Sequence, residues 1–257
     1  MTKTTTTETA LCAAFAAWAR GHGDTVYPEV GTWDLVVTTE SPSYYCLGAR
    51  NLPNRSALCR VGVQAKLVAN VAVLDQASEE VDPGPDVRLV LVPRADDAFR
   101  FVARRLGLGV ACREASYYSY GTKRWRRPEP PDDFHLYPAP RLYPTAAPLW
   151  LPPVVPDLPA GVAAPRQLTP WRVQALRFCA WARAGNDNAE GFTLQEMRKR
   201  FRLDGRRWVD SGWIVKTDKT AGRAALYRLG ERTPDQGWEA EAAKILAVDR
   251  KSLTSVP

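Results

Sequence analysis

The sequence predicts an α/β fold, in which a mixed sheet flanked by helices is followed by a small α+β domain. Over residues 8–112, apolar runs of strand length alternate with segments of helical periodicity. Between Pro128 and Pro170 lie thirteen of the chain's 21 prolines, a density that excludes helices and central strands. Helical and hairpin patterns then resume. The expected organisation is a first domain, a basic, aromatic and proline-rich linker, and a second domain, at residues 1–115, 116–167 and 168–257.

The composition indicates a protein with a hydrophobic core and no covalent cross-links. The 257 residues are 45% hydrophobic and 25% charged, and no apolar run approaches the ~18 residues of a membrane span. The N-terminus lacks the basic and then apolar layout of a signal peptide, so we expect a cytoplasmic protein with no membrane partner. The five cysteines form no CxxC pair and the chain has 2 histidines, which argues against disulfides and structural zinc.

The first domain is expected to open with a helix and a hairpin. Residues 5–8 fit a capping box, and apolar residues then recur at helical spacing as far as Trp18. Two short strands follow, at 26–30 and 32–39, joined at Gly31. After a long loop the pattern predicts strands alternating with helices, at residues 61–67, 69–80, 87–92, 95–106 and 108–112. This late alternation favours parallel pairing.

Three polar side chains on the second and third strands are the first candidates for chemistry. Asp34 lies in an apolar strand, where an unpaired acid is costly, so it needs a metal or a partner. Gln64 and Lys66 are two residues apart on the next strand and project from one face. If the strands are neighbours, the three side chains converge. An acid that binds a divalent cation, beside a lysine that holds an anionic oxygen, suits metal-assisted phosphodiester hydrolysis.

Plainer interpretations of the same residues stay open. Asp34 on an edge strand would face water, and Gln64 and Lys66 would be ordinary polar residues of a solvent-facing strand. Glu8 is a candidate for the site from the first helix, but it also suits a helix cap. Glu29, one strand before Asp34, is a candidate metal ligand or an exposed side chain.

The order of elements, with Asp34 on the second strand and Gln64-Ala65-Lys66 on the third, resembles the PD-(D/E)xK nuclease superfamily. The Gln-x-Lys form is similar to its Mrr-like restriction endonuclease branch, over residues 5–115. The resemblance implies a restriction-endonuclease-like fold, DNA as substrate and Mg²⁺ or Mn²⁺ as cofactor. Asp34 would bind the metal and Gln64 would lie beside it. Lys66 would orient or activate the attacking water, or stabilise the charge of the pentavalent phosphorus.

The sequence departs from that family in two ways. Gln64 is a poorer metal ligand than a carboxylate, and the segment around Asp34 lacks the Asp-Gly often found in that branch. Both departures leave open a nuclease fold that has lost catalysis. Many nucleases of this class act as dimers, so a homodimer is a further partner to consider, although no segment indicates a dimer surface.

A basic and aromatic stretch opens the expected linker. Residues 117–127 mix tyrosines and a tryptophan with Lys123, Arg124 and Arg126. Stacking faces beside phosphate-seeking charges suit nucleic acid. A plain solvated connector is the alternative.

The second domain carries most of the positive charge, which is +7 over the whole chain. Residues 166–228 hold fourteen Lys and Arg against six Asp and Glu. Helices are expected at 171–184, 194–201 and 204–210, followed by strands at 213–215 and 225–229 and a helix at 235–247. Three helices and a hairpin resemble a winged helix-turn-helix domain over residues 168–230. That resemblance implies DNA contacts from its helices and wing, by Arg198, Lys199, Arg200, Arg202, Arg206, Arg207, Lys216, Lys219 and Arg223.

The sequence therefore favours a metal-dependent DNA endonuclease with a basic winged-helix domain. A catalytically inactive nuclease-fold DNA-binding protein or regulator is the alternative, because fold does not imply function. A third interpretation is an adaptor whose winged helix binds protein. Metal affinity at Asp34 separates the first two, and DNA binding at moderate salt separates both from the third.

Overall fold

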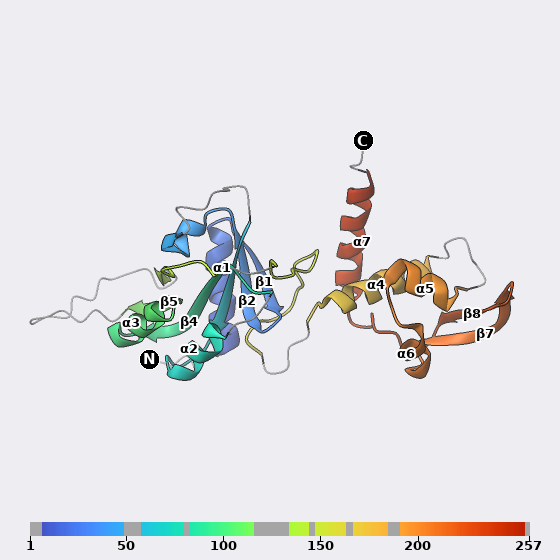
Figure 1. Ribbon diagram of the computed structural model, residues 1–257, viewed down its shortest axis with the longest axis horizontal. Coiled ribbons are helices and arrows are strands. Elements are labelled where there is room, and N and C mark those ends of the chain that lie inside the picture. The colour runs from blue at the N-terminus through green and yellow to red at the C-terminus, as the bar shows by residue number, and fades with distance from the viewer. Residues whose placement is uncertain are drawn as a thin grey trace, which may run out of the picture. The chain divides into compact units, whose positions relative to one another are not determined.

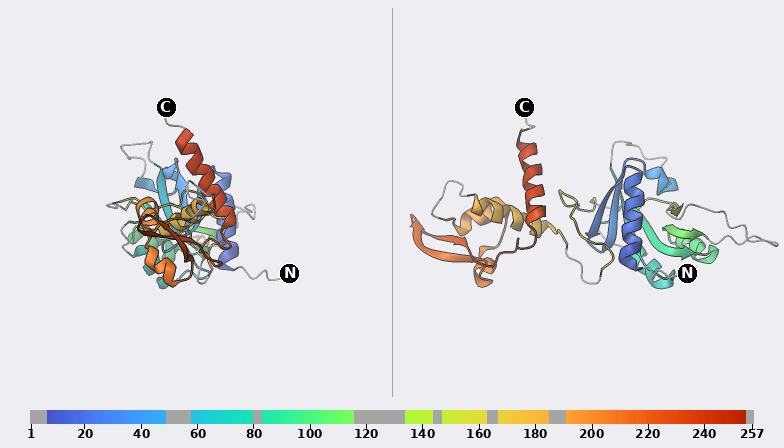
Figure 2. Two further views of the ribbon diagram at one scale, coloured as in Figure 1. Left: turned by 90° about the vertical axis from the view of Figure 1, so that its right-hand side faces the viewer. Right: turned by 180° about the vertical axis from the view of Figure 1, so that it is seen from behind.

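The computed structural model describes residues 7–48, 58–79, 83–115, 134–143, 147–162, 167–184 and 191–254 (Figures 1 and 2). The chain forms two compact units. Unit 1 contains Met1–Leu151 and Leu158–Gln167, and unit 2 contains Pro152–Asp157 and Leu168–Pro257. Each unit has its own core, and each is described separately below.

Unit 1 is built on a six-stranded mixed sheet whose strands follow one another in chain order. The strands are β1 (Thr25–Val30), β2 (Trp33–Thr39), β3 (Cys59–Ala65), β4 (Val87–Ala95), β5 (Gly109–Ala115) and β6 (His135–Tyr137). β1, β2 and β3 pair antiparallel, β3, β4 and β5 pair parallel, and β6 returns antiparallel to β5. The predicted α/β class and the parallel pairing of the later strands are confirmed.

Helices cover both faces of this sheet (Figures 1 and 2). On one face α1 (Glu8–Gly21) packs its apolar side, including Leu11 and Phe15, against the sheet. On the other face lie α2 (Val71–Ser78) and α3 (Asp97–Arg105), the crossovers that parallel strands require. Leu89 and Val90 are successive residues of β4 that face opposite cores, so this strand is buried on both sides.

Part of the expected linker belongs to the fold of unit 1, so the structure differs from the expectation of a linker over 116–167. His135–Tyr137 adds β6 to the sheet, and Phe134 is buried against Phe15 with ring centroids 5.3 Å apart. Ala139 and Ala160 are also buried in the core beneath α1. The prolines prevent a long strand here, but they still allow a short edge strand to pair and apolar side chains to pack.

Unit 2 contains three helices, a hairpin and a terminal helix. The elements are α4 (Pro170–Arg183), α5 (Leu194–Phe201), α6 (Gly205–Asp210), β7 (Ile214–Ala221), β8 (Ala224–Leu229) and α7 (Glu239–Thr254). A capping box opens α5, with Thr193 and Glu196 each bonding the other's backbone amide. Phe178, Met197 and Trp208 form the centre of the core. Arg177 joins α4 to α7 through an ion pair with Asp249 at 2.6 Å.

No helix in the described part of the chain combines the length and the apolar character needed to cross a membrane.

Candidate active site

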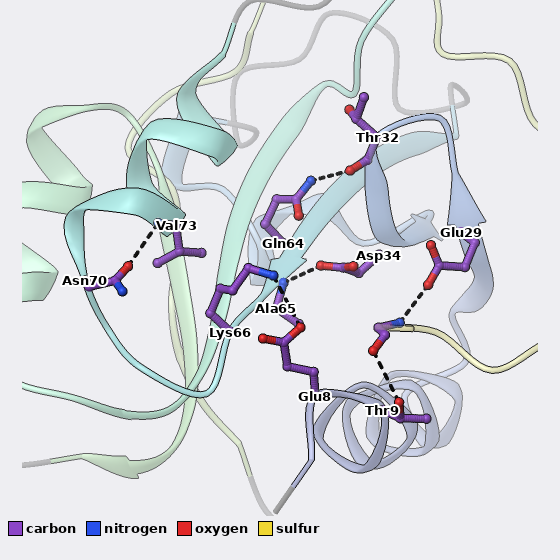
Figure 3. A network of polar contacts seen from close by, with 11 residues as sticks. Glu8, Thr9, Glu29, Thr32, Asp34, Gln64, Ala65, Lys66, Asn70 and Val73 are labelled. Atoms are coloured by element: carbon purple, nitrogen blue, oxygen red, sulfur yellow. Dashed lines mark hydrogen bonds and ion pairs between the residues drawn. The ribbon is translucent and has the colours of Figure 1, made fainter. Parts of the chain in front are cut away.

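The register of the sheet brings Asp34 and Gln64 together. Leu35 of β2 lies opposite Val63 of β3, so Asp34 and Gln64 occupy the next opposed positions of this antiparallel pair. Directly opposed residues point to the same face of a sheet, with their Cβ atoms about 4.5–5.5 Å apart. The convergence expected from the sequence therefore follows from the pairing itself (Figure 3).

Asp34 stands where β2 and β3 separate. Its Oδ2 accepts a hydrogen bond of 2.8 Å from the Ala65 amide, which the ladder leaves without a carbonyl from β2. Burial raises the pKa of this carboxyl above its ordinary value, and the Ala65 amide and the charge of Lys66 oppose that rise. The raised pKa means that the ionised form lacks part of the stabilisation that water gives, which a cation would restore.

Gln64 is 1% exposed, and of the two polar atoms of its side-chain amide only the nitrogen has a hydrogen-bond partner among the described residues. Its Nε2 donates to the carbonyl oxygen of Thr32, and because a carbonyl only accepts, this contact fixes which end of the amide is nitrogen. Its Oε1 is buried and has no hydrogen-bond partner among the described residues. An orphaned buried acceptor costs about 1–3 kcal/mol, so this oxygen is suited to a ligand that the protein itself does not supply.

Lys66 and Glu8 meet beside Asp34. Lys66 follows β3, and its amide still bonds Leu91 of β4 at 2.9 Å, which keeps the residue at the sheet edge. Its Nζ lies 3.2 Å from Oε2 of Glu8, with 37% and 31% of the two side chains exposed. Such partly exposed pairs contribute about 0–1 kcal/mol, so stability gives little reason for the contact. The pair instead directs an amine toward the Asp34 carboxylate (Figure 3).

Glu8 does not act as a helix cap. Helix α1 begins at Glu8, and its N-cap is Thr7, whose side chain accepts from Ala10 N at 3.0 Å. The capping box expected over residues 5–8 would have placed Glu8 three residues inside the helix. Because the helix begins later, the Glu8 side chain is available to Lys66.

Glu29 is buried, which is contrary to the exposed alternative, and it has a backbone partner. It lies opposite Asp34, between the pairs Pro28 with Leu35 and Val30 with Trp33. Its backbone is left-handed, with φ 52°, and its Oε1 accepts from the Gly161 amide at 2.7 Å. Figure 3 shows the Glu29 and Asp34 carboxylates directed to different partners. Burial raises the pKa of Glu29, and the amides of Gly161 and Val162 oppose that rise.

The donor set fits a hard divalent cation. No three His, Cys, Asp or Glu side chains of the described residues are grouped closely enough to hold a metal by themselves. Asp34 nevertheless offers a carboxylate beside the orphaned amide oxygen of Gln64. Mg²⁺ is commonly bound by one or two carboxylates and completes its shell with water and substrate phosphate. A carboxylate and an amide oxygen are thus the kinds of ligand that Mg²⁺ or Mn²⁺ takes from a protein.

Cys12 is a neighbour of the site that the sequence pattern did not single out. The side chain is buried in α1, and burial raises the pKa of its thiol to about 12, assisted by the negative charges of Asp34, Glu29 and Glu8. The thiol is therefore protonated at neutral pH and is no nucleophile. Cys12 lies near these three carboxylates because α1 packs on the sheet, and local sequence does not reveal that packing.

The cations proposed for DNA contact lie on the surface of unit 2. All of these cations are exposed, both on α5, α6 and the turn between them and on the hairpin. They are Arg198, Lys199, Arg200, Arg202, Arg206, Arg207, Lys216, Lys219 and Arg223. Arg200 stacks on Trp181 at 5.2 Å, and Arg207 lies 3.8 Å from Asp204. Helix α6 has 6 residues, which is short for a recognition helix. Lys123, Arg124 and Arg126 lie outside the described residues.

Comparisons with protein-family models, with curated proteins and with solved structures found no match for this chain. Its function must therefore be inferred from the side chains of unit 1 and the charges of unit 2.

Proposed function

We propose that the chain is a metal-dependent endonuclease that hydrolyses DNA phosphodiester bonds. In this proposal unit 1 is a restriction-endonuclease-like core of the PD-(D/E)xK type, and unit 2 is a winged-helix domain that holds DNA. The observation that carries the proposal is the convergence of Asp34, Gln64, Lys66 and Glu8, which come from three elements, at one edge of the sheet.

Asp34 and Gln64 would hold Mg²⁺ or Mn²⁺. The carboxylate of Asp34 supplies charge, and Oε1 of Gln64 supplies the neutral oxygen that has no partner among the described residues. A bound cation of this kind supplies Lewis acidity at the phosphate and lowers the pKa of a bound water. The Ala65 amide fixes the orientation of the Asp34 carboxylate, so the binding oxygen is preorganised.

Lys66 would act on the phosphate or on the attacking water. Its amine is within reach of an anionic oxygen held beside Asp34, where it stabilises charge that develops on the phosphoryl group. The same amine can orient the water for attack. Glu8 accepts from Nζ at 3.2 Å and so limits the directions in which the flexible lysine can point.

Unit 2 would supply affinity. Its exposed cations suit the phosphate backbone, and binding of this kind is salt-dependent and independent of sequence. The short α6 offers few side chains to a major groove, so phosphate contacts carry more of the binding than base contacts.

A DNA-binding protein without catalysis is the second candidate. It is favoured by the amide at position 64, where a carboxylate would bind a cation more strongly, and by the lack of a three-carboxylate group among the described residues. In that case the four side chains would be a remnant of a site, and unit 2 would be the functional part.

Plasmid cleavage tests the proposal. Supercoiled and linear DNA are incubated with the full chain and with Mg²⁺, Mn²⁺ or a chelator, and Asp34→Ala and Lys66→Ala are compared with the exposed control Glu40→Ala. We expect metal-dependent nicking that is lost in the first two variants and kept in the third. DNA binding without cleavage in either metal would support the second candidate instead.

A further inference from the structure

A short segment far from the site in sequence is fixed against it. Residues 158–162, here called the strap, lie on unit 1, and Ala160 of the strap is 7% exposed within the core beneath α1. Gly161 bonds in both directions: its amide donates to Glu29 Oε1 at 2.7 Å, and its carbonyl accepts from Thr9 Oγ1 at 3.2 Å. The strap therefore joins the end of β1 to the first turn of α1 (Figure 3).

Gly161 lies close to α1, at a position where a side chain would be strained. Its φ is +70°, and a Cβ atom would lie 3.1 Å from Cys12 Sγ and 3.1 Å from the carbonyl carbon of Glu8. Both the left-handed backbone and the tight contact with the helix backbone favour glycine. The strap thus touches the backbone of the residue whose carboxylate holds Lys66.

Glu29 holds this arrangement at some cost to stability. It is 6% exposed, and a left-handed non-glycine residue costs about 1–3 kcal/mol. Its charge is buried near Asp34, and the two carboxylates repel each other. The amides of Gly161 and Val162 offset part of that cost. A buried acid in a strained conformation, bonded to the segment that touches Glu8, indicates a functional reason for the residue.

We propose that Glu29 is a positioning residue of the nuclease site and not a metal ligand. Through the strap amides it seats Gly161 on the first turn of α1, and that turn sets the position of Glu8 and hence the direction of Lys66. This inference rests on the proposed function, because the direction of Lys66 matters only if the lysine takes part in the reaction.

The test compares two routes to the same perturbation. Glu29→Ala removes the acceptor, whereas Glu29→Gln keeps an oxygen that can accept from Gly161. Gly161→Ala places a methyl group in tight contact with the helix backbone, and Gly23→Ala is its matched control, since Gly23 also has a positive φ, +89°, but open space around it. For each variant, kcat and KM for plasmid cleavage are measured well below its unfolding temperature, together with amide hydrogen exchange at Leu11, whose amide bonds Thr7 in the first turn.

We expect Glu29→Ala and Gly161→Ala to lower kcat by about 10- to 100-fold, the scale of a misplacement of about 1 Å, with KM nearly unchanged. Glu29→Gln and Gly23→Ala should stay within about 3-fold of the unmodified chain, since the first keeps the acceptor and the second keeps the strap. Exchange at Leu11 should accelerate only in the two damaging variants. If Glu29→Ala does not fold, the two glycine variants decide the question.

Other results would overturn the inference. A kcat that is unchanged in Glu29→Ala and Gly161→Ala would leave the nuclease proposal intact and reject the positioning role. Equal loss in Glu29→Gln, with reduced metal affinity and unchanged exchange at Leu11, would make Glu29 a ligand instead. A native chain that cleaves no DNA would reject the nuclease proposal, and with it a catalytic role for the contact, whatever the exchange at Leu11.

Discussion

At the scale of single residues, Asp34 is an acid whose ionised form is destabilised by burial. Burial raises the pKa of its carboxyl, so the folded chain retains the proton to a higher pH than the unfolded chain does. Below the ordinary carboxyl pKa, about 3.9, both states are protonated and the contribution to folding is full. As the pH rises through the folded pKa, that contribution is lost.

Asp34→Asn should therefore stabilise the metal-free protein at neutral pH, because the amide carries no charge and its oxygen can still accept from Ala65. The free energy of unfolding, measured by denaturant titration in chelator, should be higher than that of the native chain at pH 7 and should fall less steeply above about pH 4. Unchanged or lower stability would contradict the view that the buried carboxylate is costly.

Bound metal should make the native chain more stable than Asp34→Asn. A cation present at 100 times its dissociation constant stabilises a folded protein by about 2.7 kcal/mol. We expect added Mg²⁺ or Mn²⁺ to stabilise the native chain and to leave Asp34→Asn unchanged in a thermal melt. An equal metal response in both proteins would place the binding elsewhere.

The sequence predicts some of these residues and not others. The two-residue spacing of Gln64 and Lys66, and an acid in an apolar strand, are local patterns, and strand pairing made them converge. The role of Glu29 depends on a left-handed backbone and on a partner that is 132 residues away. No local pattern encodes a contact at that separation.

At the scale of elements, the helices and strands of unit 1 follow the apolar periodicity of the sequence, with α3 as the exception. Val102 and the C-cap residue Leu106 continue the apolar pattern of α3, yet these are 44% and 39% exposed, while Ala103 is fully buried. A short crossover helix covers only part of the sheet, so its apolar pattern is wider than its contact. β6 was missed for another reason, since it has 3 residues and follows a proline-rich stretch.

The segment after β5 should be needed for the stability of unit 1. Phe134 is 7% exposed and packs edge-on against Phe15, at an interplanar angle of 88°. We expect Phe134→Ala to lower the free energy of unfolding by about 3–5 kcal/mol, the usual cost of removing a buried aromatic ring. Thermal unfolding of the full chain measures this, and Tyr44→Ala, at a side chain 59% exposed, is the control. A loss below that of the control would return this segment to the status of a linker.

At the scale of the whole molecule, the positive charge and the candidate active site lie in different parts of the sequence. Residues 166–228 hold fourteen basic residues against six acidic ones, whereas the residues at the candidate active site are mostly acidic or neutral. The sequence predicted this separation well, since charge is read directly from composition. It did not predict where unit 1 ends, because residues 134–143 and 158–162 join its core through contacts that are distant in sequence.

The separation predicts a characteristic salt dependence. Replacing Arg206 and Arg207 with alanine should weaken DNA binding about equally for all sequences. The slope of log affinity against log salt should become shallower by about 0.9 for each phosphate that the variant no longer neutralises. Lys244→Ala, which removes an exposed cation from α7, is the control for a change of charge alone. Equal slopes for these variants and the control would exclude α6 from the DNA interface.

The most direct test of the account is the single-turnover rate constant for plasmid cleavage at saturating protein. Lys66→Ala should lose cleavage while keeping DNA binding and nearly all of its stability, because its pair with Glu8 is worth about 0–1 kcal/mol. Arg206→Ala should keep the rate constant and require more protein to reach it. A Lys66→Ala variant that cleaves at the native rate constant would contradict the assignment of the active site.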